Sequence, residues 1–147
     1  MTSFLVRDAR PMDAPAIARL SVQLGYPCTE QECRERMAAV LGQPGNAVLV
    51  AEAAGQVLGW AHVVGAHRIE SAPFAELCGL VVDETHRGSG IGKALVQAAG
   101  RWAAEAGFVR LRVRCNAVRE ESHAFYLRLG FSIIKTQKVF STPLETA

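Results

Sequence analysis

The sequence predicts an α/β protein in which a central mixed sheet carries helices on both faces. Apolar runs of strand length alternate with amphipathic stretches of helical period along the chain. A strand, a glycine-rich turn and a long helix follow one another in the second half, and 147 residues suit a single domain over residues 1–147. The predicted order of elements is β-α-α-β-β-β-α-β-α-β, with no linker and no internal repeat.

The first half of the chain is expected to supply two helices and three strands. Asp13 stands where the N-cap of the first helix belongs, and Thr29 begins a capping box, S/T-x-x-E, that Glu32 completes. Two apolar runs of strand length are joined by Ala54-Gly55, which predicts a β-hairpin. The sheet is therefore expected to begin with antiparallel strands. The predicted elements are a strand over Phe4–Arg7, helices that end near Leu24 and Leu41, and strands over Ala47–Ala53 and Val57–Val64.

The second half is expected to continue the sheet with a parallel unit. Both faces of its first strand are apolar, as in a strand that is covered on both sides, and Gly107 stops the helix that follows. A strand, a helix and a strand in succession form a right-handed parallel unit. The predicted elements are strands over Phe74–Val82, Val109–Cys115 and Phe131–Phe140, and helices over Ile91–Ala106 and Glu120–Leu129.

Composition and charge narrow the classes of partner. Half of the residues are apolar and 20% are charged, which excludes a disordered chain. Sixteen Lys and Arg against fourteen Asp and Glu give a net charge of +2, too close to neutral for sequence-independent binding to nucleic acid. We therefore do not expect nucleic acid as a partner.

The sequence also indicates a cellular setting. Its four cysteines include no C-x-x-C pair and are expected to be reduced. No apolar run approaches the roughly 18 residues that a membrane span needs. Arg7, Asp8 and Arg10 interrupt the N-terminus before the apolar region of a signal peptide can form. We expect a cytoplasmic protein that makes no membrane contact.

The most informative segment joins a buried strand to the N-terminus of a helix. Glycines occupy every second position from Gly88 to Gly92, which removes the Cβ atoms that would block a close approach. Unpaired N–H groups at a helix N-terminus attract anions, and Arg87 and Lys93 add positive charge. The segment therefore predicts a phosphate-binding turn, with a plain glycine turn as the alternative.

Two better-known phosphate motifs fail here at single positions. A P-loop, G-x-x-x-x-G-K-[ST], needs glycine at position 87 and Ser or Thr at position 94, where Arg87 and Ala94 stand. A dinucleotide fingerprint that starts at Gly88 meets Lys93 in place of its third glycine. The signature R/Q-x-x-G-x-G/A does match, because Arg87-Gly88-Ser89-Gly90-Ile91-Gly92 fills every position.

In this signature the chain resembles the GNAT superfamily of N-acetyltransferases. The resemblance continues at Asn116, which ends the next strand, and over Ala124–Phe131, which is similar to the family's second acetyl-coenzyme A element. The order of elements from residue 4 to residue 140 also agrees. The resemblance implies a GNAT-like acyl-coenzyme A N-acyltransferase fold, one N-acetyltransferase domain, and acetyl-coenzyme A (acetyl-CoA) as co-substrate.

The same resemblance implies how acetyl-CoA is held. Backbone N–H groups of residues 88–93 would bind its pyrophosphate, and the backbone of Leu80–Val82 would pair with the pantetheine arm as an added strand does. Asn116 would contact that arm from the opposite wall, or it is simply a polar residue that ends a strand. The predicted acetyl-CoA-binding residues are Leu80, Val81, Val82, Arg87, Gly88, Ser89, Gly90, Ile91, Gly92, Lys93, Asn116 and Tyr126.

Acetyl transfer to an amine needs a base for the amine and an acid for the departing thiolate. The resemblance implies Tyr126 as the acid, because a phenol of pKa about 10 can reprotonate a thiolate whose thiol has a pKa of about 8.5. The alternative is that Tyr126 is an aromatic residue of the core without a catalytic role.

The candidate base is Glu76. It stands eleven residues before Arg87, a spacing similar to that of the catalytic glutamate in the histone acetyltransferase branch. Desolvation in an apolar strand would suit it to accept a proton through water, and a solvent-facing glutamate, another carboxylate or water alone is the alternative.

The acceptor site is expected to form from parts that vary between relatives, chiefly residues 24–29 and 66–73. The candidate substrate-binding residues are Tyr26, His67, Glu70 and Glu76, and for the first three an ordinary loop role is the alternative. No acidic run in the sequence suggests a polycationic acceptor. The sequence does not identify the acceptor further.

Two further patterns carry no assigned function. Arg110, Arg112 and Arg114 alternate with apolar residues, so a strand would place three guanidinium groups on one face. A solvated sheet edge or a dimer contact is the favoured interpretation, and an acidic acceptor or the outer phosphate of coenzyme A is the alternative. The four histidines form no i, i+4 pair on a helix, so no metal site is expected.

The sequence therefore predicts an acetyl-CoA-dependent N-acetyltransferase that moves an acetyl group directly to a primary amine of a small molecule or a protein. The alternatives are a toxin-like acetyltransferase of aminoacyl-tRNA and a non-catalytic sensor of acyl-CoA. The resemblance also favours a homodimer that pairs through its last strands.

Overall fold

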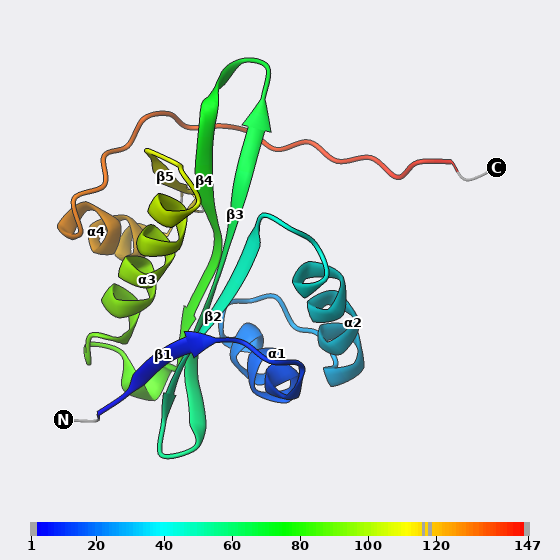
Figure 1. Cartoon of the computed structure of the whole chain (residues 1–147), viewed down its shortest axis with the longest axis vertical. Helices are drawn as coiled ribbons and strands as arrows, with labels where there is room; N and C mark the ends of the chain where they lie inside the picture. Colours follow the sequence, from blue (N-terminus) through cyan, green and yellow to red (C-terminus); the bar gives the residue numbers. More distant parts are fainter. Residues whose placement is uncertain (1–2, 116, 118, 146–147) are drawn as a thin grey trace. The chain divides into compact units, whose positions relative to one another are not determined.

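The computed structural model describes residues 3–115, 117 and 119–145 (Figure 1). Contacts divide the chain into two compact units, Met1–Arg114 and Cys115–Ala147. Among the described residues, the first unit holds a five-stranded sheet and the helices α1 to α3, and the second holds the helix α4. The assignment of the whole chain to one domain stays a prediction.

The sheet has the strand order β1-β2-β3-β4-β5. The first three pairs of neighbours are antiparallel and the last pair, β4 with β5, is parallel. Because α3 connects the two parallel strands, the predicted strand-helix-strand unit and the mixed sheet are confirmed. The strands are β1 (Leu5–Asp8), β2 (Asn46–Ala53), β3 (Gln56–Arg68), β4 (Ser71–Val82) and β5 (Leu111–Val113).

Helices cover both faces of the sheet, as the sequence predicts. α1 (Ala14–Gln23) and α2 (Glu30–Leu41) lie on one face, and α3 (Ile91–Glu105) lies on the other (Figure 1). Trp60 of β3 packs against a buried cluster that includes Leu20 of α1 and Met37 of α2. A Cβ atom added at Gly59 would instead meet Ile91 and Leu95 of α3. Neighbouring residues of β3 therefore point to opposite helical layers, as the alternation of a strand requires.

The start of α2 follows the predicted capping box. The Thr29 hydroxyl accepts a hydrogen bond from the Glu32 N–H at 3.0 Å, and the Glu32 carboxylate accepts one from the Thr29 N–H at 3.0 Å. Two N–H groups that the first turn of a helix leaves unpaired are satisfied in this way. This local signal is sufficient to place the beginning of the helix.

Asp13 is the N-cap residue of α1, as expected, but its carboxylate accepts no hydrogen bond from that helix. It accepts hydrogen bonds from both terminal nitrogens of Arg7, at 2.9 and 3.0 Å, and one from the Arg10 N–H at 2.7 Å. Arg7 also donates to Glu52 of β2 at 2.7 Å. The Arg7 guanidinium is a charged donor and the Asp13 side chain is only 6% exposed, so this ion pair is stronger than a cap on helix N–H groups in water, and it ties β1 to the turn before α1.

The predicted last strand over Phe131–Phe140 is not formed. The structure describes these residues without regular secondary structure, and it shortens the preceding strand from Val109–Cys115 to Leu111–Val113. Ile133, Ile134 and Phe140 are exposed. A strand needs a hydrogen-bonding neighbour, and an apolar alternation by itself does not supply one.

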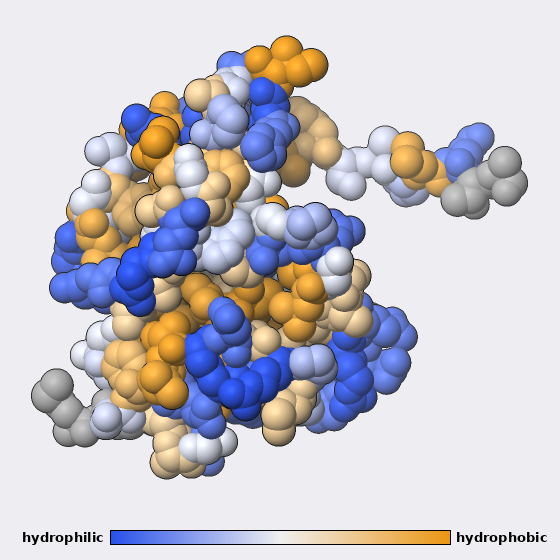
Figure 2. Space-filling model, in the orientation of Figure 1, coloured by the Kyte–Doolittle hydropathy of each residue, from blue (hydrophilic) through white to orange (hydrophobic). Residues whose placement is uncertain are grey.

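The hairpin between β3 and β4 extends past α1 and α2 (Figure 1). Figure 2 shows hydrophobic colour at its end, where Ile69 is fully exposed. Deeper along the hairpin, Phe74, Ala75 and Leu77 are buried. The sheet is thus covered at its centre, while the hairpin turn lies in solvent.

We predict that Asp13→Asn lowers the free energy of unfolding by about 1 to 3 kcal/mol, because Arg7, which is mostly removed from water, then loses one of its two carboxylate partners and keeps only Glu52. The Arg7 guanidinium lowers the pKa of Asp13 in the folded protein. Its stabilisation is therefore complete above the ordinary carboxyl pKa of about 4 and is lost as the pH falls through the lower folded value. Urea unfolding of both proteins should show their difference shrinking below about pH 4. The exposed Asp8→Asn is the control, and a difference that persists in acid would contradict this account.

Candidate active site

The turn between β4 and α3 presents a set of unpaired backbone N–H groups. α3 begins at Ile91, and its N-cap, Gly90, has φ +89°, while Gly88 has φ +82°. An L residue with a side chain rarely adopts such angles, so glycine is required at both positions. A Cβ atom added at either would meet nothing within 4 Å, which leaves the turn open to a ligand.

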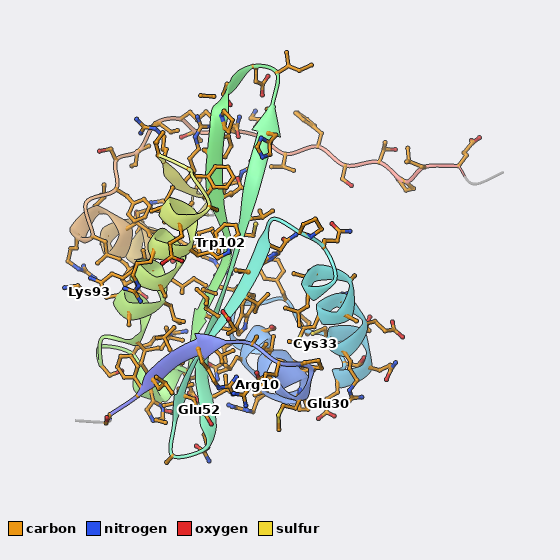
Figure 3. The ribbon with its side chains drawn as sticks, in the orientation of Figure 1. Arg10, Glu30, Cys33, Glu52, Lys93 and Trp102 are labelled. Atoms are coloured by element: carbon orange, nitrogen blue, oxygen red, sulfur yellow. The ribbon has the colours of Figure 1, made fainter. Side chains whose placement is uncertain are left out.

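The first N–H groups of α3 have no partner within the helix, because the N–H of Ala94 is the first to bond, to the Gly90 carbonyl at 3.0 Å. No described side chain caps them. Lys93, on this first turn, is exposed (Figure 3), and Arg87, which precedes the turn, is exposed as well. Bare amides, the positive end of the helix and two cations together fit a diphosphate.

Hydrogen bonds within the preceding loop hold this turn in shape. The Asp83 carboxylate accepts from the Thr85 N–H at 3.1 Å and from the Thr85 hydroxyl at 3.0 Å. The Thr85 N–H lowers the pKa of Asp83. Ser89 donates its hydroxyl to the carbonyl of His86. Since the side chain of Ser89 is engaged inside the loop, only its backbone is available to a ligand.

Beside the turn, β4 has an unpaired edge. β4 pairs with β5 only over Ala75–Leu77, whereas it pairs with β3 along almost its whole length. Within the described residues of the first unit, the backbone groups of Leu80–Val82 on the β5 side therefore have no strand partner. An amide-bearing chain could pair there as an added strand. Val81 itself is buried, and Leu80 and Val82 are partly exposed.

Glu76 lies in the middle of β4 and not at a strand end. Its side chain is 15% exposed and forms an ion pair with Arg114, with 2.8 Å between Nε and Oε1. The Cys78 thiol lies 4.0 Å from its other carboxylate oxygen. Burial and the charge of Glu76 raise the pKa of Cys78, so this cysteine is a neutral neighbour. Glu76 is thus a shielded carboxylate with one cationic partner.

The partner of Glu76 was missed by sequence reasoning. Arg114 follows β5 directly, and the parallel register sets Arg112 opposite Glu76. The alternating arginines are visible in the sequence, but only the register of β4 against β5 shows that one of them neutralises the candidate base.

Tyr126 belongs to α4 (Glu120–Arg128) in the second unit. Its ring lies 5.0 Å from that of Phe125 and 5.5 Å from that of Phe131. Burial raises the pKa of Tyr126, and Cys115 raises it further, so the phenol keeps its proton at neutral pH. A proton donor and a packed aromatic both agree with this setting, and the catalytic role stays a prediction. Asn116 lies outside the described residues.

The remaining candidates do not lie together. Tyr26 is exposed in the loop between α1 and α2. His67 and Glu70 are exposed at the end of the β3–β4 hairpin. The His67 ring lies 5.8 Å from that of Phe108, which follows α3. His67 therefore points to the α3 face of the sheet, whereas Glu76 points to the opposite face, as the register with β3 shows.

All four cysteines are free. In the described part of the chain, no three His, Cys, Asp or Glu side chains form a group that could hold a metal ion. None of the described helices combines the length and the apolar character that a bilayer span requires.

The model of the acetyltransferase (GNAT) family matches residues 15–131, which include the glycine turn, β4, β5 and α4. The chain belongs to the GNAT family of acetyltransferases. As a member of this family it is an N-acetyltransferase that uses acetyl-CoA as co-substrate. The open turn and the bare amides of α3 fit this ligand, because they suit a diphosphate attached to an amide-bearing arm.

Relatives and solved structures agree with this assignment. The chain is 31% identical over 144 residues to aminoglycoside N(6')-acetyltransferase type 1 of Stenotrophomonas maltophilia, covering 95% of this chain and 94% of the relative. It is 33% identical over 140 residues to the uncharacterized N-acetyltransferase YjgM of Escherichia coli strain K12, covering 88% and 83%. The structure of AAC(6')-Iy with the bisubstrate analogue CoA-S-monomethyl-acetylneamine superposes with a TM-score of 0.86 at 20% identity, over 97% and 100% of the two chains. The GNAT-like fold expected from the sequence is confirmed.

We predict that Gly90→Asp weakens acetyl-CoA binding at least about 100-fold, because it places a negative charge among amides that suit phosphate. Gly90→Ala should weaken binding much less, since it adds strain without charge. Gly55→Asp is the matched control, because Gly55 has φ +78° and equally open surroundings but lies in the β2–β3 hairpin. Calorimetric titration with acetyl-CoA measures all three, and unchanged affinity in Gly90→Asp would contradict the placement.

Proposed function

We propose that this N-acetyltransferase passes the acetyl group in one step from acetyl-CoA to a primary amine of a small molecule or a protein. The observation that supports the proposal is that two stretches with unpaired backbone groups follow each other along the chain. The turn at Gly88 and Gly90 offers bare amides for the diphosphate, and it directly follows the unpaired edge of β4 over Leu80–Val82. The pantetheine arm would run along that edge toward Glu76.

In the proposed step the neutral amine nitrogen attacks the carbonyl carbon of the thioester. The new C–N bond forms, the C–S bond breaks, and coenzyme A leaves as a thiolate. Glu76, acting through water, takes the proton that the amine loses, and Tyr126 gives a proton to the thiolate. The partly buried position of Glu76 and the protonated state of Tyr126 support these roles.

The relatives support a small molecule as the acceptor class. The name of the Stenotrophomonas maltophilia relative gives aminoglycosides as the substrates of that protein, and the chain matches nearly the full length of it. We therefore place small-molecule amines ahead of proteins as acceptors. The net charge of +2 does not support binding to aminoacyl-tRNA.

The decisive experiment separates co-substrate from acceptor. Acetyl-CoA should raise the melting temperature of the protein, and a panel of amines should then release free thiol from acetyl-CoA. Stabilisation without thiol release from any amine would favour the non-catalytic sensor. Absence of stabilisation would count against the binding turn itself.

We further propose a cytoplasmic homodimer. Four free cysteines suit a reducing compartment. Ile133, Ile134, Val139 and Phe140 are exposed along one segment without regular structure, which supports a subunit contact there. Light scattering of the purified protein measures the assembly, and a monomer at micromolar concentration would contradict it.

We predict that Tyr126→Phe lowers kcat about 100-fold or more, the usual contribution of a general acid, with an unchanged Kd for acetyl-CoA. The aromatic ring and its contacts with Phe125 and Phe131 are retained in this variant. Steady-state kinetics, calorimetry and a melting curve together make the test. Full kcat in a normally folded variant would assign Tyr126 to packing alone.

We predict that Glu76→Gln lowers kcat about 100-fold or more, because an amide cannot accept the proton that the amine loses. The exposed Glu105→Gln, at the end of α3, is the control for the loss of one charge. Steady-state kinetics measure both variants, and full kcat in a normally folded Glu76→Gln would move the role of base to another group.

A further inference from the structure

Four arginines lie on the face of the sheet to which the candidate base Glu76 points. Val64 and Ala66 of β3 share the face of Trp60, which is the face of α1 and α2, and they are paired with Glu76 and Phe74 of β4. Residues paired across a sheet point the same way, so Glu76 and Phe74 also point to this face.

The arginines reach this face from β5 and from the end of β3. Arg112 is paired with Glu76, so it shares the same face, and alternation adds Arg110 and Arg114. The guanidinium carbon of Arg112 lies 4.0 Å from the ring centroid of Phe74, and that of Arg68 lies 5.5 Å from it. We call Arg68, Arg110, Arg112 and Arg114 the arginine face.

The charge of the arginine face is mostly uncompensated. Arg114 pairs with Glu76, and Arg68, Arg110 and Arg112 form no ion pair with any described carboxylate. The Nε atom of Arg112 is buried, and no described residue accepts a hydrogen bond from it. A guanidinium that is partly removed from water without an anion is costly, and an anionic ligand removes that cost.

An anion bound at the arginine face would be distinct from the diphosphate of acetyl-CoA. Val82 lies six positions further along β4 than Glu76, which corresponds to about 20 Å of extended strand. The glycine turn lies beyond Val82. The arginine face therefore lies at the end of β4 that the thioester would reach and not at the end that suits the diphosphate.

We propose that the amine acceptor carries a carboxylate and that the arginine face, chiefly Arg112 and Arg68, binds it. The proposal rests on the function proposed above and names the acceptor class for that site. Planar guanidinium groups bind carboxylates with two parallel hydrogen bonds, which would hold the amine in one orientation near Glu76. A polycationic acceptor would instead meet like charge. The proposed acceptor class differs from the aminoglycosides that the name of the Stenotrophomonas maltophilia relative gives.

The test compares acceptors that differ only in the anion. Thiol release from acetyl-CoA is followed with γ-aminobutyrate against butylamine, and with L-alanine against L-alaninamide. Thiol release with phosphoethanolamine is compared with that for ethanolamine, which tests whether a phosphate can replace the carboxylate. Neamine is included as a polycationic acceptor. We expect kcat/KM to be at least about tenfold higher for the acceptors that carry a carboxylate than for their neutral counterparts. The difference should come from a lower KM and not from a higher kcat. Equal values, or preference for phosphoethanolamine or neamine, would overturn the proposal.

Matched variants assign the preference to the arginine face. Arg112→Gln and the exposed Arg68→Gln should each raise KM for the carboxylate acceptor at least about fivefold and leave KM for its neutral counterpart unchanged. Arg112→Lys, which keeps the charge, should recover part of the loss. Arg101→Gln, on the exposed side of α3, is the control for net charge. Equal effects of Arg68→Gln and Arg101→Gln, or conversion of a dimer to a monomer by Arg112→Gln, would overturn the proposal in favour of a solvated or subunit surface.

Failure of the proposed function can be told apart from failure of this inference. Calorimetric titration of the coenzyme A-loaded protein with γ-aminobutyrate and with butylamine measures the anion preference without turnover. Preference for γ-aminobutyrate with no acetylation of any amine would support the arginine face and reject the catalytic role. Absence of preference would reject the arginine face, whatever the activity.

Discussion

The structure depends on a backbone turn that only glycine can make. At Gly88 and Gly90 the chain adopts positive φ angles and then enters α3 with its first N–H groups unpaired. An internal network about Asp83 and Thr85 holds the loop, so the amides do not have to be ordered when a ligand binds. The entropic cost of shaping this turn is met during folding, which favours the proposed binding of a diphosphate by main-chain atoms.

The strand β4 links this turn to Glu76, where the proton transfer is proposed. β4 is paired with β3 along almost its whole length and with β5 only over Ala75–Leu77, so it is held in the sheet and still leaves an edge open. Glu76 lies where the parallel pairing is intact and where Arg114 can reach it. A chain of nearly neutral net charge thus has a strongly basic area around one carboxylate. Local charge, rather than total charge, determines which acceptors such a surface favours.

Much of this could be predicted from the sequence, because the signals are local. Thr29 and Glu32 specify the start of α2 within four residues, and the glycines of the turn specify backbone angles that no other residue accepts easily. Two expectations were not met, and both depend on tertiary contacts that a local pattern does not contain. The Asp13 carboxylate bonds Arg7, which also bonds Glu52 of β2, instead of the first N–H groups of α1. Residues Phe131–Phe140 form no strand, because a strand needs a neighbouring strand.

The sequence by itself determined the order of most elements, the mixed sheet and the glycine turn before α3, since periodicity and backbone preference belong to short segments. Only the tertiary structure decided which side chains share a face. It placed Arg112 and Phe74 beside Glu76, and it turned His67 to the opposite side of the sheet. Strand register makes that choice, because a shift of one residue exchanges the two faces, and register is set by pairing across the whole sheet.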